Sequence, residues 1–180
     1  MENDIKKVSK YLSYILRHKP EEIGLVLDEN GWGLISDLIS KTTSFNLTLD
    51  LLQIVVETND KQRFAIDPVT EMIRANQGHS IDVDLALAAI EPPEFLLHGS
   101  AEKFASSIIE NGLKKQNRHH VHLSQTASVA KSVGGRYGKP VLFTVKAKLM
   151  FDDGFKFYKT VNHVWLVSDV PAKYLIKHNA

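Results

Sequence analysis

Two consecutive prolines near the middle of the 180-residue chain, Pro92 and Pro93, restrict its fold more than any other feature. Proline fixes φ and has no backbone N–H, so the pair can neither continue a helix nor pair within a central strand. With a glutamate on either side, the segment is typical of a short, stiff connection. The sequence therefore predicts two domains, over residues 1–90 and 94–180.

The part before the prolines has the periodicity of helices followed by a hairpin. Its first apolar residues recur at three- and four-residue spacing, which predicts an amphipathic helix. These residues are Ile5, Val8, Leu12, Ile15 and Leu16. Pro20 should end this helix, and shorter helices are expected after Ser36 and Thr48. Strands over residues 63–66 and 72–74, separated by a turn, complete a pattern that is typical of a winged helix.

The part after the prolines alternates short strands with two helices. A strand over residues 95–97 is expected to end at His98, after which Ser100 caps a helix that Gly112 ends. A second helix is expected after Thr126. The remaining strands are predicted over residues 121–123, 140–147, 156–161, 164–167 and 174–176. Many short strands around two helices predict a compact α+β fold.

The composition excludes several classes of protein. Without cysteine, the chain cannot have disulfides, thiolate metal sites or thiol nucleophiles. Its formal net charge of +1 argues against a protein that coats nucleic acid through bulk charge. No apolar stretch reaches the roughly 18 residues of a membrane span, and the polar N-terminus has no secretory signal. We therefore expect a cytoplasmic protein without membrane contact, and a monomer.

Two short segments contain residues that bind anions. Arg17 and His18 close the first helix, where the simplest interpretation is two cations at the negative end of the helix dipole. An arginine fork also matches a phosphate in two-point geometry, and with Arg63 these residues would bind a terminal phosphate dianion. The tripeptide at residues 98–100, His-Gly-Ser, is the second segment. Its glycine lets a ligand approach the backbone, and the helix expected to follow it attracts anions.

A glycine-rich segment over residues 134–140 is superficially similar to a phosphate loop. Val133 stands where the first glycine of such a loop would be, and Pro140 replaces the residue that holds magnesium. A nucleoside triphosphatase is therefore disfavoured. Arg136 is left between glycines, where the backbone is free to approach a ligand.

Three histidines close together in sequence, His119, His120 and His122, suggest a metal site. No carboxylate lies between Lys114 and Val133 to complete a ligand set or to orient an imidazole. A basic strand edge is the favoured interpretation, and we expect no metal.

Six short motifs follow one another along the chain. They are SYILRHKP at 13–20, KQRF at 61–64, IRANQGHS at 73–80, LHGS at 97–100, HVHLS at 120–124 and VGGRYG at 133–138. Together they resemble the RNA 2′-phosphotransferase family, also called tRNA 2′-phosphotransferase. The resemblance extends from about residue 9 to about residue 168, which is nearly the whole chain.

The resemblance implies an N-terminal winged-helix lobe, a C-terminal lobe with the ADP-ribosyltransferase fold, and an active site in the cleft between them. It implies metal-independent removal of an internal RNA 2′-phosphate, as in tRNA splicing and processing, with NAD as the acceptor and 2′-phosphorylated RNA, such as tRNA, as the partner. The 2′-phosphate attacks C1″ of the nicotinamide ribose and nicotinamide leaves. The ribose O2″ then attacks the phosphate of this ADP-ribosylated RNA. The products are 2′-hydroxyl RNA and ADP-ribose 1″,2″-cyclic phosphate.

The resemblance also assigns roles to particular residues. The catalytic residues that it implies are Arg17, His18, Arg63 and Arg136. The NAD-binding residues that it implies are His98, Gly99, Ser100, His122, Leu123 and Ser124. The RNA-binding residues that it implies are Arg17, His18, Arg63, Gln77 and His79. The RNA phosphate would then lie on the first lobe and NAD on the second.

Three other functions are to be weighed against this one. A winged-helix DNA-binding regulator needs a basic recognition helix, but residues 48–58 contain Asp50 and Glu57 and no Lys or Arg. A protein-modifying ADP-ribosyltransferase usually carries a late glutamate, whereas residues 140–143 are apolar. ADP-ribose capping of a terminal nucleic-acid phosphate would use the same fold, and the sequence does not separate it from 2′-phosphate removal.

Overall fold

The computed structural model describes residues 2–178 of a mixed α and β chain. The chain forms two compact units, residues 1–86 (unit 1) and residues 87–180 (unit 2). The proline pair belongs to unit 2, because Pro92 is buried and the N–H of Ile90 donates to the carbonyl of Phe157. None of the helices in the described residues is long and apolar enough to cross a bilayer.

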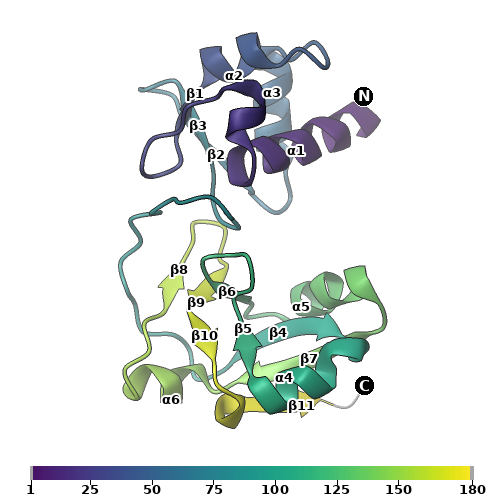
Figure 1. Cartoon of the computed structure of the whole chain (residues 1–180), viewed down its shortest axis with the longest axis vertical. Coiled ribbons are helices and arrows are strands. Elements are labelled where there is room, and N and C mark those ends of the chain that lie inside the picture. The colour runs from purple at the N-terminus through teal and green to yellow at the C-terminus, as the bar shows by residue number, and fades with distance from the viewer. Residues whose placement is uncertain (1, 179–180) are drawn as a thin grey trace. The chain divides into compact units, whose positions relative to one another are not determined.

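Unit 1 combines three α-helices with one small antiparallel sheet (Figure 1). Its elements are α1 (Glu2–Arg17), β1 (Gly33–Leu34), α2 (Ile35–Lys41), α3 (Leu49–Glu57), β2 (Phe64–Asp67) and β3 (Met72–Ala75). The sheet has the order β1-β3-β2, so β3 lies in the middle. The hairpin β2–β3 was expected from the sequence, whereas the two-residue β1 was not. Strands this short have no periodicity, and β1 exists because it pairs with β3.

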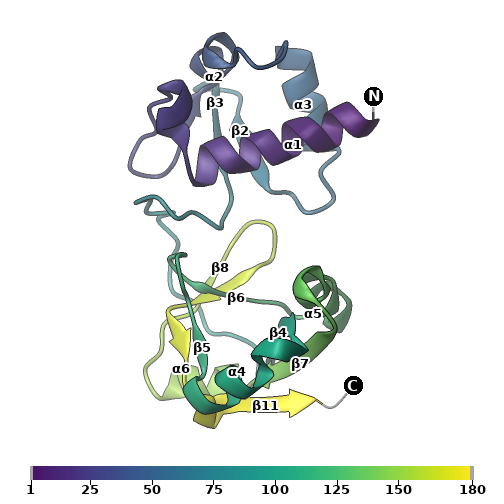
Figure 2. The same cartoon turned by 45° about the vertical axis from the view of Figure 1, so that its right-hand side comes forward.

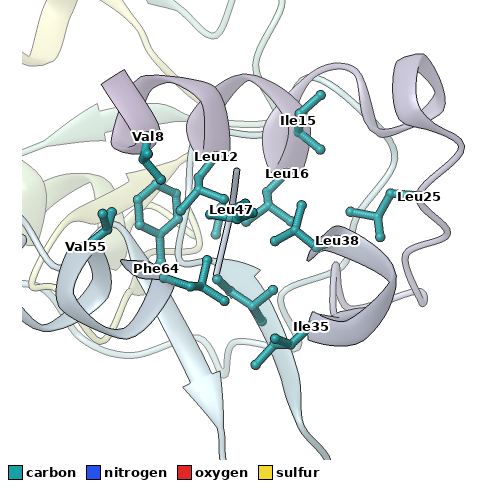
Figure 3. Packing of buried hydrophobic residues seen from close by; sticks show 13 residues of the cluster. Val8, Leu12, Ile15, Leu16, Leu25, Ile35, Leu38, Leu47, Val55 and Phe64 are labelled. Atoms are coloured by element: carbon teal, nitrogen blue, oxygen red, sulfur yellow. The ribbon is translucent and has the colours of Figure 1, made fainter. Parts of the chain in front are cut away.

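Local chemistry sets the end of α1 and the start of α3, whereas α2 begins at Ile35, before the expected Ser36, and has no side-chain cap. Pro20 follows the end of α1 and starts a 3₁₀ turn. The side chain of Thr48 caps α3 by accepting the N–H of Leu51 at 3.2 Å. The predicted apolar face of α1 is buried, with Leu12 and Leu16 inaccessible to solvent. Figure 3 shows these side chains directed at residues of α2, α3 and β2, which together form the core of unit 1.

Unit 2 consists of short antiparallel pairings with small helices around them (Figure 2). Its strands are β4 (Leu96–Ala101), β5 (Leu113–Lys114), β6 (Val121–Leu123), β7 (Pro140–Val145), β8 (Tyr158–Lys159), β9 (Trp165–Val167), β10 (Asp169–Val170) and β11 (Leu175–His178). Its α-helices are α4 (Ala105–Asn111), α5 (Ala127–Gly134) and α6 (Ala147–Asp152). The α+β class predicted from the sequence is therefore correct.

Two three-stranded sheets of unit 2 meet at one point. The first has the order β11-β7-β4 and the second the order β6-β9-β8. Leu97 of β4 and Ser124, just after β6, exchange two backbone hydrogen bonds of 2.7 and 2.8 Å. This bridge places the segment at residues 98–100 next to β6, although more than twenty residues separate them in sequence.

The structure corrects the prediction for residues 98–100. They lie inside β4, which pairs with β7 along its whole length from Leu96 to Ala101, and not after the end of a strand. Ser100 caps no helix, because a 3₁₀ turn at Glu102–Phe104 precedes α4. Glycine and serine are weak strand formers, but pairing with β7 overrides their local preference. The predicted strand at 140–147 is also shorter, since β7 ends at Val145 and α6 follows.

Glycine at position 99 is required by packing. A Cβ at Gly99 would lie 1.7 Å from the carbonyl oxygen of Ala130, so α5 lies directly on β4. This helix–sheet contact was not expected from the sequence, and the role of Gly99 in ligand approach stays a prediction. Gly134 contributes to the same contact, because its Cβ would lie 2.5 Å from the carbonyl oxygen of Ser100.

The close contact between α5 and β4 predicts different effects for two alanine substitutions. Gly99→Ala should lower the free energy of unfolding by about 3 kcal/mol or more, the upper end for overpacking, because backbone must move. Gly135→Ala is the matched control, since nothing lies within 4 Å of its Cβ position. It should leave stability within about 0.5 kcal/mol of the wild type. Urea unfolding of both variants measures the difference, and equal stabilities would contradict the packing role of Gly99.

Candidate active site

The first group of candidate residues lies at the C-terminal end of α1. The segment after β3 folds back onto this end, where the N–H of Ser80 donates to the carbonyl of Arg17 at 2.9 Å. The Nδ1 atom of His18 lies 2.9 Å from the Oγ of Ser80. Arg17 and His18 are thus fixed by a loop that belongs to the IRANQGHS motif, and two segments far apart in sequence form one site.

The Arg17 side chain is packed and not simply solvated at the helix end. Its Cζ lies 6.0 Å from the centre of the Phe64 ring. Its Nη1 would lie 3.6 Å from a Cβ at position 78, where Gly78 has a φ of +87°. Glycine is favoured at this position because L side chains rarely adopt such a φ. A helix-dipole interaction alone does not require these contacts.

Arg63 joins this group from the start of β2. Its N–H donates to the Oδ1 of Asn59 at 3.3 Å, and its carbonyl accepts the N–H of Asn76 at 2.8 Å. Arg63 is also the neighbour of Phe64, on which Arg17 lies. The backbone around Arg63 is therefore held from two directions. Arg17 and His18 at the end of α1 and Arg63 just before β2 come from two segments of unit 1, and the loop at residues 76–80 donates backbone hydrogen bonds to the carbonyls of both Arg17 and Arg63.

The two other predicted RNA-binding residues of unit 1 differ in exposure. Gln77 is partly buried, whereas His79 is 4% exposed and packs against Gly31. The burial of His79 favours a role in shaping the loop over direct contact with RNA.

In unit 2, His98 and His122 are connected through the backbone. The Nδ1 of His98 lies 3.1 Å from the carbonyl oxygen of His122, so this nitrogen donates. Burial lowers the pKa of His98 below its ordinary value of 6.5; the hydrogen bond to the His122 carbonyl raises it by less, and the charge of Arg118 has the smallest effect and lowers it. A neutral His98 with a proton on Nδ1 has its Nε2 lone pair available to accept a hydrogen bond.

Arg118, to which the sequence assigned no role, contacts the second of these histidines. Its Nη1 lies 2.9 Å from the Nδ1 of His122, so the guanidinium donates to this imidazole. Two hydrogen bonds therefore connect His98 to His122 and His122 to Arg118, whose side chain is exposed. Its position just before the HVHLS motif was the available signal, but a charged residue in a basic run is usually assigned to solvent.

The remaining predicted residues of unit 2 are arranged less simply. The Ser124 hydroxyl is engaged with Thr126, donating to its carbonyl at 3.2 Å and accepting its N–H at 3.1 Å. Leu123 is 2% exposed in the core, so only its main chain could meet a ligand. Ser100 is partly buried two residues after His98 in β4, on the same face of the strand. Arg136 is exposed in a 3₁₀ turn at Gly135–Tyr137.

His120 lies at the edge of an open hollow at one end of the sheet β6-β9-β8. The hollow has a volume of about 520 Å³ and is lined by His120, Asp153, Gly154, Phe155, Lys156, Tyr158 and Ser168. The His120 ring meets that of Tyr158 edge-on at 5.6 Å, and burial lowers its pKa. Within residues 2–178, no group of three or more His, Asp or Glu side chains is arranged to hold a metal ion.

The lowered pKa of His98 predicts a dependence of stability on pH. Below about pH 6.5 the unfolded chain binds a proton at this position that the folded chain resists, so folding stability falls as the pH falls. We expect the melting temperature of the wild type to fall more between about pH 8 and about pH 5 than that of His98→Gln, because glutamine does not titrate. Parallel shifts in the two proteins would contradict the neutral state of His98.

Comparison with known proteins supports the motifs on which these sites rest. Residues 2–169 match the model of the "RNA 2'-phosphotransferase, Tpt1 / KptA family". A probable RNA 2′-phosphotransferase of Flavobacterium johnsoniae is 53% identical over 176 residues, which are 97% of each chain. Another from Nostoc punctiforme is 48% identical over 173 residues, covering 95% of this chain and 96% of the relative. A third, from Acaryochloris marina, is 47% identical over 180 residues, covering 98% and 99%.

These matches identify the class of protein as a transferase. The chain belongs to the RNA 2′-phosphotransferase family, as its six motifs predicted. Membership supports an RNA 2′-phosphotransferase activity with an RNA substrate.

Proposed function

We propose that this protein removes an internal 2′-phosphate from RNA by transferring it to NAD. The products would be nicotinamide, 2′-hydroxyl RNA and ADP-ribose 1″,2″-cyclic phosphate, and no metal would be needed. The observation that carries the proposal is that the loop of the IRANQGHS motif contacts all three residues: it donates backbone hydrogen bonds to the carbonyls of Arg17 and Arg63, and Ser80 lies against the His18 ring. Two guanidinium forks and an imidazole are suited to a phosphate dianion.

We propose a winged-helix fold for unit 1 and an ADP-ribosyltransferase-like fold for unit 2, with the domains at residues 1–90 and 94–180. The element order α1-β1-α2-α3-β2-β3 and the sheet order β1-β3-β2 support the first assignment. A role for this fold in sequence-specific DNA binding is disfavoured, because α3 exposes Asp50, Gln53 and Glu57 and contains no basic residue. The basic residues of the candidate site belong to other segments.

NAD would be held by unit 2, and the residues there fit its chemistry. The lone pair of neutral His98 can accept a hydrogen bond from a ribose hydroxyl, and the Ser100 hydroxyl can donate or accept one. Arg118 supplies positive charge beside His122. When bound, NAD would supply the ribose carbon that accepts the phosphate and the nicotinamide that leaves it. His122 would contribute by holding the His98 ring through its carbonyl, and the contacts of Leu123 and Ser124 with NAD rest on the family resemblance.

The reaction divides the work between two steps. In the first, a phosphate oxygen bonds to C1″ while the bond from C1″ to nicotinamide breaks, so the chain mainly orients the dianion through Arg17 and Arg63. In the second, O2″ bonds to phosphorus, the bond from phosphorus to the RNA O2′ breaks, and the O2″ proton is lost to solvent. The departing O2′ takes a proton from His18, and the arginines stabilise charge on the phosphate oxygens.

One experiment tests this function directly. The protein is incubated with an RNA oligonucleotide that carries a single internal 2′-phosphate, with and without NAD and in the presence of a chelator. We expect 2′-hydroxyl RNA and one nicotinamide per phosphate removed only when NAD is present. Phosphate release without NAD, or inhibition by the chelator, would reject the proposed reaction.

The assignment of NAD to unit 2 has its own test. The double variant His98→Ala/Ser100→Ala should bind NAD at least about ten-fold more weakly by calorimetry, because two hydrogen-bonding groups are lost. Its binding of 2′-phosphorylated RNA should be unchanged, since those contacts are assigned to unit 1. Equal NAD affinity in the double variant and the wild type would contradict the assignment.

A further inference from the structure

The sheet of unit 1 has an outer face that the assigned roles do not explain. Along β3, Ile73 and Ala75 point into the core, so Arg74 points away from it. By the same alternation, Phe64 of β2 is buried, and Arg63 and Ala65 face outward. Ala65 pairs directly with Arg74, which makes Arg63 and Arg74 diagonal neighbours on this face. Diagonal neighbours across two strands are about 7–8 Å apart.

Trp32 continues this face on the other side of β3. Gly33 pairs with Ile73, so the preceding residue, Trp32, lies opposite Arg74. The Cζ of Arg74 is 4.6 Å from the centre of the Trp32 ring, which is a close cation–π contact. Both side chains are only partly buried. Arg63, Arg74 and Trp32 therefore form a row across the outer face of the sheet, one from each strand or its flank.

The loop that carries Trp32 is fixed by hydrogen bonds, and Arg74 is partly buried on this face. The Oδ1 of Asp28 accepts the N–H groups of Asn30 and Trp32 at 2.9 and 2.8 Å, which fixes the loop before β1. Asp28 is the carboxylate that raises the pKa of Arg74, but burial has the larger effect and lowers it. The Nε of Arg74 is buried and has no hydrogen-bond partner among the described residues. A partly buried arginine whose Nε has no hydrogen-bond partner among the described residues is suited to an anionic ligand.

We infer that Trp32 and Arg74 form a binding subsite for a nucleotide adjacent to the 2′-phosphorylated one. Trp32 stacks on its base, and Arg74 contacts a phosphodiester next to the 2′-phosphate at Arg63. Aromatic stacking accepts any base, and the arginine fork matches a phosphate, which is the usual combination for binding single-stranded RNA. The inference rests on the proposed function, because it takes Arg63 as the phosphate contact. The subsite selects RNA strands over isolated 2′-phosphates.

Fluorescence of Trp32 gives a direct test. The chain has two tryptophans, and Trp165→Phe leaves Trp32 as the reporter. The Trp165 Nε1 is buried without a hydrogen-bond partner in the described part of the chain, so phenylalanine breaks no bond there. Titration with 2′-phosphorylated RNA should quench Trp32, and the same RNA with abasic nucleotides on both sides of the phosphate should not. Equal quenching by the two RNAs would overturn the inference.

Affinity measurements on variants complete the test. Arg74→Gln and Trp32→Leu should bind the intact RNA roughly 5- to 150-fold more weakly, whereas Trp32→Phe should retain most of the affinity. Lys10→Gln, which removes an exposed charge from α1, is the control and should bind as the wild type. NAD affinity should be unchanged in all four variants. Unchanged RNA affinity in Arg74→Gln would overturn the inference even if Trp32→Leu fails to fold.

The same measurements separate the inference from the proposed function. If the wild type removes the 2′-phosphate but the variants and the abasic RNA behave normally, only the subsite is wrong. If the wild type has no activity on 2′-phosphorylated RNA with NAD, the proposed function itself fails. RNA that lacks the 2′-phosphate could also quench Trp32 and bind with the same affinity as 2′-phosphorylated RNA. This result would mean that the face binds RNA independently of Arg63, and it would reject a subsite next to the 2′-phosphate.

Discussion

Replacement of His18 by alanine is expected to lower the rate of RNA 2′-phosphate removal by roughly a hundred- to ten-thousand-fold, the usual contribution of a general acid. The effect should fall on the second step. In the first step the phosphate is already a nucleophile and the leaving group is a neutral pyridine, so little proton transfer is required. In the second step an RNA alkoxide departs, and an alkoxide without a proton donor leaves slowly. RNA carrying an ADP-ribosylated 2′-phosphate should therefore accumulate.

Rapid-quench time courses of nicotinamide release and phosphate removal measure the two steps separately. Arg63→Ala should show the same accumulation with a loss on the order of a hundred- to a thousand-fold, by analogy with oxyanion-hole donors. His178→Ala is a suitable control, because this exposed histidine contacts Thr144 at the edge of unit 2. If His18→Ala slows both steps equally and no intermediate appears, His18 does not act as the proton donor of the second step.

The second large effect is expected at Arg118. The family resemblance gives the last catalytic arginine to Arg136, but the structure connects Arg118 to His122, whose carbonyl holds His98. Arg118→Ala should therefore cost about a hundred- to a thousand-fold in turnover, the usual loss when one positioned phosphate donor is removed. Arg136→Ala should cost less than about ten-fold, because Arg136 lies in the 3₁₀ turn Gly135–Tyr137, outside this connection.

Arg118→Lys distinguishes a charge contact from a structural one. Lysine keeps the charge but lacks the planar fork, so a partial recovery of turnover over Arg118→Ala would indicate contact with the reacting phosphate. Thermal unfolding of the three variants should be similar, since Arg118 is exposed. The reverse order, with a large loss in Arg136→Ala and a small one in Arg118→Ala, would return the role to Arg136.

Much of unit 1 followed from the sequence because its signals are local. The apolar spacing from Ile5 to Leu16 predicted α1, and Pro20 ended it. Thr48 capped α3, and the hairpin β2–β3 formed where strand residues flank a turn. Each of these rules acts within about one or two turns of chain, so no knowledge of distant residues was needed.

Residues 98–100 show where such local reasoning failed. Glycine and serine predicted the end of a strand, but pairing with β7 carries β4 through both residues. The same glycine packs against α5, a contact that the sequence did not predict. Both features have one physical cause, which is that strand pairing and helix–sheet packing are decided by partners distant in sequence.

The sequence by itself determined the family, through six ordered motifs, and the residue types that can bind a phosphate. It could not determine which of those residues meet. Only the tertiary structure placed Gly78 against Arg17, connected Arg118 through His122 to His98, and aligned Arg63, Arg74 and Trp32 on one face of a sheet. These arrangements depend on strand register and on chain segments folding back, and one-residue changes in register would move each side chain to the opposite face.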